Sequence, residues 1–475
     1  MITCQKFIAL ICLIAFLFFS SNSCTRTSKT SPNMVFIMTD DQGYRDAGFM
    51  GHPHLQTPNL DAMANNGLRL DRFYANPVCS PTRASFLTGR HPNRTAVFAW
   101  GHALRPQEDT FVAQLQQAGY RTGFFGKWHL GSVRAESDTN PGVHGFDEWV
   151  AAPNFYLNDP WMSRNGNPVQ FKGESSVVTA ELALEFIEEA AAGDAPFLVF
   201  IWTGSPHDPH RATPELQALY PDLPDDQKNY YGEISGIDMA VGMVRDRLRE
   251  LDLAEQTIVL FTSDNGGRTP LANNGELRGS KGDLWEGGIR VPTVIEWPGK
   301  IAPRISDVPS GIVDLYPTFL ELANVEPVEP VLPKDGISLV PLLNGEMHHR
   351  ETPMRFWRYF GVRGQRMRSD EIVLDLEKYQ RGELELEDLN EGRLNTPDMP
   401  YDDLEQRPGM AAWIDGDWKL YKDRDESLKL FNLAEDPGES VNLIEEHPDL
   451  ARRMHYDLNN WQDSVINSIR GWDYK

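Results

Sequence analysis

Short apolar runs alternate along this chain with longer stretches of helical periodicity. Apolar runs without polar alternation are typical of strands buried on both faces of a sheet. The strands predicted in this way cover Met34–Met38, Arg121–Phe125, Phe197–Trp202 and Thr257–Phe261. The helices predicted around them cover Thr57–Asn66, Thr110–Ala118, Ser175–Ala192 and Gln227–Leu251. This alternation predicts an α/β fold with a large, mostly parallel sheet flanked by helices.

The pattern changes after about residue 345. Residues 365–408 are acidic and contain Pro and Gly but few apolar runs, which predicts a surface insertion or a long loop. The elements predicted beyond it are two short strands with an Asp-Gly turn in Ala411–Tyr421, a strand at Leu428–Leu433 and a helix at Asp449–Ile469. We therefore expect one large domain over residues 33–345 and a smaller C-terminal α+β subdomain over residues 346–475.

The first 24 residues have the pattern of a signal peptide, with a lysine before the apolar run Phe7–Phe19 and small polar residues after it. That run is too short to span a bilayer comfortably. Cys24 follows the small residues as in a lipoprotein processing site, and ordinary cleavage just before it, with a soluble product, is the alternative. Residues 25–32 then form a short polar tether. We expect an exported protein of the periplasm or cell surface, or a secreted one, which is attached to a membrane only if Cys24 is lipidated.

The composition indicates a globular, acidic protein. Of 475 residues, 40% are hydrophobic and 24% are charged, with a formal net charge of −24. This charge argues against nucleic acid and anionic membrane as partners, because phosphate binding requires a basic surface. An acidic enzyme can still bind an anion where a few cations are concentrated in a cleft.

Cysteine usage singles out one thiol. Three of the four cysteines belong to the leader or its edge, and only Cys79 lies in the globular body, so no disulfide is expected there. A lone thiol in an exported protein is open to oxidation and mispairing. A buried, inert cysteine is the alternative, and the neighbouring residues decide between the two.

Polar clusters follow the first and last of the predicted strands. Asp40 and Asp41 come after Met34–Met38, and Asp264 and Asn265 come after Thr257–Phe261. Ligands gather at the carboxyl ends of parallel strands, and a set of oxygen donors favours Ca²⁺ or Mg²⁺ over zinc. Either cluster alone could simply form a turn or a helix cap. Together they predict a metal site.

The most specific motif is Cys79-Ser-Pro-Thr-Arg83, followed by Leu87-Thr-Gly-Arg90. It resembles the formylglycine-forming motif of the sulfatases, Cys-x-Pro-x-Arg with a Thr-Gly block. Further blocks that resemble this family are Asn33–Asp41, Gly126–Leu130, Ser205–His207, Ser263–Asn265, Gly279–Gly282 and Asp436–Leu443. One departure is Thr82, where the family often has Ser. The resemblance implies a fold similar to that of the alkaline phosphatase superfamily.

The resemblance also implies the chemistry of Cys79. A separate formylglycine-generating enzyme would oxidise this residue to formylglycine, which is then hydrated to a geminal diol. One hydroxyl attacks sulfur and leaves sulfate bound to the enzyme, and the other expels sulfate and regenerates the aldehyde. One calcium ion, with Mg²⁺ as the less favoured alternative, would be held by Asp40, Asp41, Asp264 and Asn265 and would bind a sulfate oxygen and the diol.

The remaining catalytic residues implied by the resemblance are cations and histidines. Arg83 would steady the diol, while Lys127 and Lys281 would neutralise sulfate oxygens. His129 would hydrogen-bond the diol, and His207 would protonate the leaving alcohol. Solvated lysines and a partly buried histidine are the alternatives for single residues.

The sequence thus predicts a sulfatase, and by family analogy a sulfated polysaccharide or oligosaccharide as its substrate. Two alternatives remain open. One is a phosphodiesterase or phosphonate hydrolase of the same superfamily, which can share the formylglycine and the metal. The other is a catalytically inert, glycan-binding protein on a sulfatase-like scaffold, against which the intact motif residues weigh.

Overall fold

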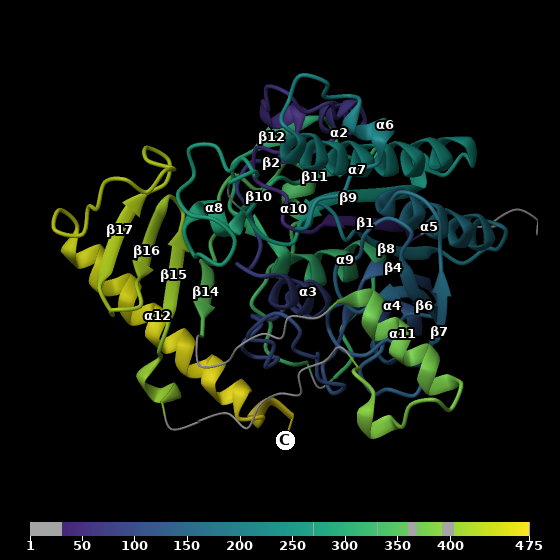
Figure 1. Cartoon of the computed structure of the whole chain (residues 1–475). Coiled ribbons are helices and arrows are strands. Elements are labelled where there is room, and N and C mark those ends of the chain that lie inside the picture. The colour runs from purple at the N-terminus through teal and green to yellow at the C-terminus, as the bar shows by residue number, and fades with distance from the viewer. Residues whose placement is uncertain (1–30, 269, 330, 360–367, 392–402, 475) are drawn as a thin grey trace, which may run out of the picture. The chain divides into compact units, whose positions relative to one another are not determined.

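A large mixed sheet organises the chain, as the computed structural model shows (Figure 1). In spatial order its ten strands are β12 (Arg304–Ser306), β2 (Leu68–Leu70), β11 (Val294–Glu296), β9 (Thr257–Ser263), β1 (Asn33–Thr39), β8 (Phe197–Trp202), β4 (Arg121–Lys127), β5 (Glu148–Ala152), β6 (Trp161–Arg164) and β7 (Asn167–Gln170). The run from β9 to β5 is parallel, whereas β11, β6 and β7 are antiparallel to their neighbours. The prediction of a parallel sheet is therefore right for its centre, and the edges are mixed.

Helices cover both faces of the sheet. The helices that precede the C-terminal subdomain are α2 (Pro58–Asn66), α3 (Cys79–Thr88), α4 (Phe111–Gln117), α5 (Ser175–Ala191), α6 (Pro214–Gln217), α7 (Asp225–Glu250), α8 (Glu286–Ile289), α9 (Leu315–Ala323) and α10 (Val340–Leu343). Of these, α6 packs on α7, and α8 packs toward the C-terminal subdomain. Alternate residues of β1 enter two separate cores, with Phe36 among α3, α4 and α9, and Val35 and Ile37 among α2, α5 and α7. Because both faces are buried, the strand is apolar at every position.

A second, antiparallel sheet forms the C-terminal subdomain (Figure 1). Its strands are β14 (Met354–Arg358), β15 (Met410–Asp415), β16 (Trp418–Lys422) and β17 (Leu428–Asn432), and helix α12 (Pro448–Ile469) lies against it. A third, separate sheet has three short strands in the order β10 (Arg290–Val291), β3 (Phe73–Tyr74) and β13 (Ser310–Gly311). The smaller α+β subdomain is confirmed, and its boundary near residue 345 stays a prediction.

Part of the acidic segment is helical, whereas a long loop was one of the two structures predicted for it. Helix α11 (Ser369–Gln380) occupies part of residues 365–408 and packs on β6 and β7. Its buried side chains Ile372, Val373 and Leu376 lie on one helical face. Three apolar residues among many acidic ones were too few to form an apolar run, although they suffice for one buried stripe.

The structure describes residues 31–474 without 269, 330, 360–367 and 392–402. The predicted signal peptide and most of the tether lie outside the described residues, as do parts of the acidic segment. Within the described ranges, no helix is long and apolar enough to cross a membrane. Export and lipidation therefore stay predictions.

A buried lysine joins the C-terminal sheet to the large sheet's loops. Lys419 Nζ of β16 lies 3.0 Å from Glu286 Oε1 and 2.8 Å from Glu439 Oε1, and all three side chains are fully buried. The Trp285 ring stacks on the Tyr421 ring at 3.8 Å between centroids. These contacts fix the segment that precedes α8 against the C-terminal subdomain.

A buried histidine joins the loop after α3 to α12. The His91 ring lies edge-on to the Trp461 ring, 4.9 Å between centroids, and its Nε2 accepts a hydrogen bond from the Trp357 amide at 3.1 Å. Burial, helped by the neighbouring cations Arg94 and Arg355, lowers the pKa of His91 to about 3. The imidazole is therefore neutral in the folded protein over most of the acid range.

We expect His91 to weaken the fold as the pH falls. The unfolded chain binds a proton at this residue below about pH 6.5, and the folded chain does not until about pH 3, so stability is lost as the pH drops between these values. The free energy of unfolding, measured in urea at pH 7.5 and pH 5, should depend less steeply on pH in His91→Gln than in the unchanged protein. The difference in slope should be up to about 1.4 kcal/mol per pH unit. The exposed His349→Gln should keep the slope of the unchanged protein. Equal slopes for all three proteins would contradict this role of His91.

Candidate active site

The two predicted oxygen clusters lie side by side at one edge of the large sheet. β1 and β9 are parallel neighbours with Thr39 opposite Ser263, so Asp40 and Asp41 emerge next to Asp264 and Asn265. The Asp41 backbone amide donates to Asp264 Oδ1 at 3.2 Å, and Asn265 Nδ2 donates to Asp41 Oδ1 at 2.8 Å. All four residues are buried. The fold thus brings the adjacent carboxylates Asp40 and Asp41 together with Asp264, which follows them by more than 220 positions in sequence.

Cys79 lies directly beside these carboxylates. It is the first residue of α3, and its Sγ and one oxygen each of Asp40 and Asp41 lie within 4.8 Å of one another. Burial raises the pKa of the Cys79 thiol to about 11. An unmodified thiol at this position is therefore almost fully protonated at neutral pH and a poor nucleophile.

The three predicted cations each pair with one carboxylate. Lys127 Nζ lies 2.6 Å from Asp40 Oδ2, and Lys281 Nζ lies 2.6 Å from Asp41 Oδ1. Arg83, one helical turn after Cys79 on α3, donates to Asp264 Oδ2 at 2.8 Å and to the Lys127 carbonyl at 2.8 Å. The three ion pairs are therefore Arg83 with Asp264, Lys127 with Asp40, and Lys281 with Asp41.

The carboxylates differ in proton affinity. Burial alone would raise the pKa of Asp40 and of Asp41, but the cations Lys127 and Lys281 hold both pKa values below their ordinary range. Burial and the negative charge of Asp40 raise the pKa of Asp264 to about 7, against the opposing effect of Arg83. The pKa of Lys281 is raised, because its carboxylate neighbours outweigh burial.

Buried acceptors without donors mark a candidate metal site. Asp40 Oδ1 and Asn265 Oδ1 are buried and accept no hydrogen bond from the described residues. Leaving such oxygens unsatisfied is costly, and a cation among them removes the cost. The donors are all oxygens, which suits a hard divalent ion. The residues present therefore fit a metal at this position.

The two predicted histidines both reach this cluster. His129 is buried with φ of +55°, and neither ring nitrogen has a hydrogen-bond partner among the described residues. Burial and the nearby cations Lys127 and Arg83 lower its pKa, which keeps the ring neutral. Ser80 Oγ, in the turn beside Cys79, donates to the His129 carbonyl at 2.7 Å and fixes this backbone.

His207 lies next to Asp41. Its Nε2 is 3.7 Å from Asp41 Oδ2, and its Nδ1 is 2.7 Å from the Asp208 carbonyl, which can only accept and so keeps the proton on Nδ1. The ring stacks on Phe155 at 4.3 Å between centroids. Sequence reasoning missed Phe155, because no motif marks it and only the loop after β5 brings it to His207.

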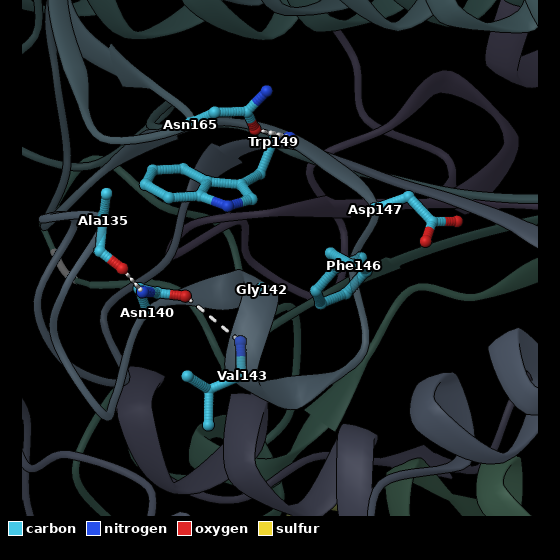
Figure 2. A pocket seen from close by; sticks show the side chains of 8 residues that line it. All are labelled: Ala135, Asn140, Gly142, Val143, Phe146, Asp147, Trp149 and Asn165. Atoms are coloured by element: carbon cyan, nitrogen blue, oxygen red, sulfur yellow. Dashed lines mark hydrogen bonds between the residues drawn. The ribbon is translucent and has the colours of Figure 1, made fainter.

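A separate surface cavity of about 510 Å³ carries no comparable chemistry (Figure 2). Asn140, Asp147, Asn165 and Trp149 are among the residues that line it. The amide of Asn140 bonds the carbonyls around Ala135, Asp147 accepts from Thr122, and Asn165 Oδ1 accepts from the Trp149 amide. These polar groups stabilise the cavity wall, so we assign the cluster around Cys79 as the candidate active site.

Comparison with known proteins identifies the family. The family model described as Sulfatase matches residues 32–325. The chain belongs to the sulfatase family. It is 34% identical over 370 residues to N-acetylgalactosamine-6-sulfatase of Canis lupus familiaris, covering 69% of this chain and 68% of that protein. It is 32% identical over 451 residues to steryl-sulfatase of Rattus norvegicus, covering 73% and 76%.

Solved structures agree with this assignment. The crystal structure of Ps i-CgsB in complex with k-i-k-neocarrahexaose has a TM-score of 0.76 and 25% identity, and covers 91% of this chain and 93% of that chain. The sulfatase therefore has an alkaline phosphatase-like fold, and it is a sulfuric ester hydrolase by family membership. The resemblance seen in the sequence is thereby confirmed at the level of family, fold and reaction class.

Proposed function

We propose that this sulfatase hydrolyses sulfate esters of a polysaccharide or oligosaccharide, using a formylglycine formed from Cys79 and one bound calcium ion. The observation that carries the proposal is Cys79 Sγ beside oxygens of Asp40 and Asp41. Saccharide substrates are supported by two similar proteins, one named for a sulfated amino sugar and one bound to neocarrahexaose.

Oxidation of Cys79 is the step that would supply a usable nucleophile. The thiol is held protonated by burial, whereas a hydrated aldehyde offers two hydroxyls, one for attack and one for release of sulfate. A separate maturation enzyme must perform this oxidation. Because the thiol is buried in the finished fold, we expect the modification to precede folding.

The surrounding side chains would bind sulfate and hold the reacting atoms. Lys127 and Lys281 place ammonium groups against the carboxylates, where they can also neutralise sulfate oxygens as charge grows in the transition state. Arg83 lies on the same face of α3 as Cys79 and orients the modified side chain. Calcium, when bound, would supply Lewis-acid polarisation of a sulfate oxygen and favour ionisation of the nucleophile.

His207 is the proposed general acid. Its proton sits on Nδ1 against the Asp208 carbonyl, and its Nε2 faces the carboxylate side of the site. Protonated at Nε2, the ring can deliver that proton to the leaving alcohol, and stacking on Phe155 holds its plane. Neutral His129 would hydrogen-bond the diol instead.

The remaining alternatives differ in what they turn over. A phosphodiesterase or phosphonate hydrolase would prefer an aryl phosphodiester to an aryl sulfate, and an inert glycan-binding protein would turn over neither. Our proposal requires the aryl sulfate to be preferred. For the location, we propose export to the periplasm or cell surface, or secretion. Lipidation at Cys24 and simple cleavage of the signal peptide are the two alternatives for its processing.

Cys79 should be found as formylglycine in protein from its own host. The tryptic peptide from Phe73 to Arg83 should have the mass of the aldehyde or its hydrate. Cys79→Ala should lower turnover of 4-nitrophenyl sulfate more than about 10³-fold with the fold retained. Thr82→Ser is the matched control on α3. It should stay modified, because the family often has Ser at this position, and it should stay folded, because the hydroxyl that accepts from the Asn76 amide is kept. An unmodified cysteine in an active enzyme would contradict the proposal.

Calcium should stabilise the folded protein through the four oxygen ligands. After chelation, Ca²⁺ at 100 times its Kd should add about 2.7 kcal/mol to the free energy of unfolding, seen as a rise in Tm. Asp40→Asn and Asn265→Ala should remove most of this rise, and the exposed Asp194→Asn should leave it intact. Mg²⁺ should give a smaller rise at equal concentration. A calcium effect that survives both ligand variants would rule out this site.

A further inference from the structure

A buried carboxylate that the proposed reaction does not use lies just beyond the predicted metal ligands of β1. Asp46 follows Asp41 by five positions, and its side chain is fully buried. His52 Nε2 lies 3.9 Å from Asp46 Oδ1, and burial lowers the pKa of His52 to about 4, so this ring is neutral near pH 7. Within the described ranges, no charged cation therefore pairs with Asp46.

Three neutral donors hold the Asp46 carboxylate instead. The Gly43 amide donates to Oδ2 at 2.9 Å, the Asn273 amide donates to Oδ1 at 3.1 Å, and the Tyr230 hydroxyl donates to Oδ2 at 2.6 Å. Burial and the charge of Asp46 raise the pKa of Tyr230, so its hydroxyl keeps the proton that it donates. Burial raises the pKa of Asp46 to about 7, and the three donors oppose this rise because they stabilise the charged form.

The three donors belong to three different segments. Gly43 lies in the loop that follows β1, Asn273 lies in the loop that follows β9, and Tyr230 lies on α7. The first two loops carry the two pairs of predicted metal ligands. Helix α7 is fixed by its packing on α2, α5 and α6. Asp46 therefore joins the two ligand loops to each other and to a long helix.

The two ligand loops also lie in close backbone contact beside this carboxylate. A Cβ on Gly43 would lie 2.7 Å from the Asn273 carbonyl oxygen, and a Cβ on Gly267 would lie 2.6 Å from the Gly43 Cα. Gly267 lies two residues after Asn265, and its carbonyl accepts from the Lys281 amide at 3.2 Å. Because neither approach leaves room for a side chain, a displacement of one loop moves the other as well.

We propose that Asp46 is a positioning residue of the calcium site, and that its hydrogen bonds to the two ligand loops raise the affinity for calcium. The physical reason is preorganisation, because ligands that already hold their positions lose less freedom when the ion binds. Mutation of groups that hold metal ligands in place typically lowers metal affinity about 10- to 100-fold. The inference rests on the proposed function, since it assumes that calcium binds the four predicted ligands.

The test measures calcium binding to the chelated protein by calorimetry at pH 8, where most of Asp46 is ionised. In Asp46→Asn, we expect the calcium Kd to rise about tenfold, because the single oxygen and the NH₂ group of the amide cannot accept from all three donors. Tyr230→Phe should raise the Kd by a smaller factor. It removes one donor and keeps the charge of Asp46, so it separates positioning from simple attraction of the ion by that charge.

Asp238→Asn and Tyr220→Phe are the matched controls. Asp238 is a buried carboxylate of α7 that accepts from the Leu60 amide at 2.8 Å, and the Tyr220 hydroxyl lies 2.6 Å from Ser235 Oγ. In the part of the chain that the structure describes, neither side chain bonds a ligand loop. Both variants should lower the free energy of unfolding of the calcium-free protein, measured in urea, and keep the calcium Kd of the unchanged protein.

Several results would overturn the inference while the unchanged protein still binds calcium. A purely structural role would make Asp46→Asn less stable and leave its Kd unchanged. A rise in Kd that Tyr230→Phe does not share would indicate attraction by the charge alone, and an equal rise in the controls would indicate a general loosening of the fold. If Asp46→Asn does not fold, the comparison of Tyr230→Phe with Tyr220→Phe decides. If the unchanged protein binds no calcium, the metal site of the proposed function fails, and the inference fails with it.

Discussion

The constraint on which the structure depends is the burial of three carboxylates at one edge of the sheet. Asp40, Asp41 and Asp264 leave neighbouring parallel strands at the same level, and none of them is exposed to water. Such a cluster would repel itself and lose its hydration without compensation. Each carboxylate therefore has a cation, Arg83, Lys127 or Lys281, within hydrogen-bonding distance.

The cations come from parts of the chain that the fold must hold in place. Arg83 is fixed by α3, which packs on the sheet and on α9, and Lys127 ends a central strand. Lys281 lies in a loop, and the C-terminal subdomain supports that loop through Lys419 and the stacked rings of Trp285 and Tyr421. The smaller sheet thus contributes to the site as a support.

Prediction from sequence was accurate where burial repeats a simple pattern. The strands at β1 and β8 and the helices α2, α5 and α12 were predicted to within a residue or two. The antiparallel strands β6 and β7 were missed, because they are short and partly exposed, so their pattern is weak. Helix α11 was missed for a related reason, since its buried stripe has only a few apolar residues.

By itself, the sequence determined the family and the order of the main elements, and it predicted the residues of the candidate site. Local motifs carry this information. The spacing that puts Cys79 and Arg83 on one helical face can be recognised without knowing any contact between distant segments, and so can the polar residues that follow apolar strands. Only the tertiary structure decided which cation faces which carboxylate, that Phe155 supports His207, and that Asp46 bonds Asn273. These contacts join segments far apart in the chain, and their distances depend on how sheets and helices pack, which no local pattern encodes.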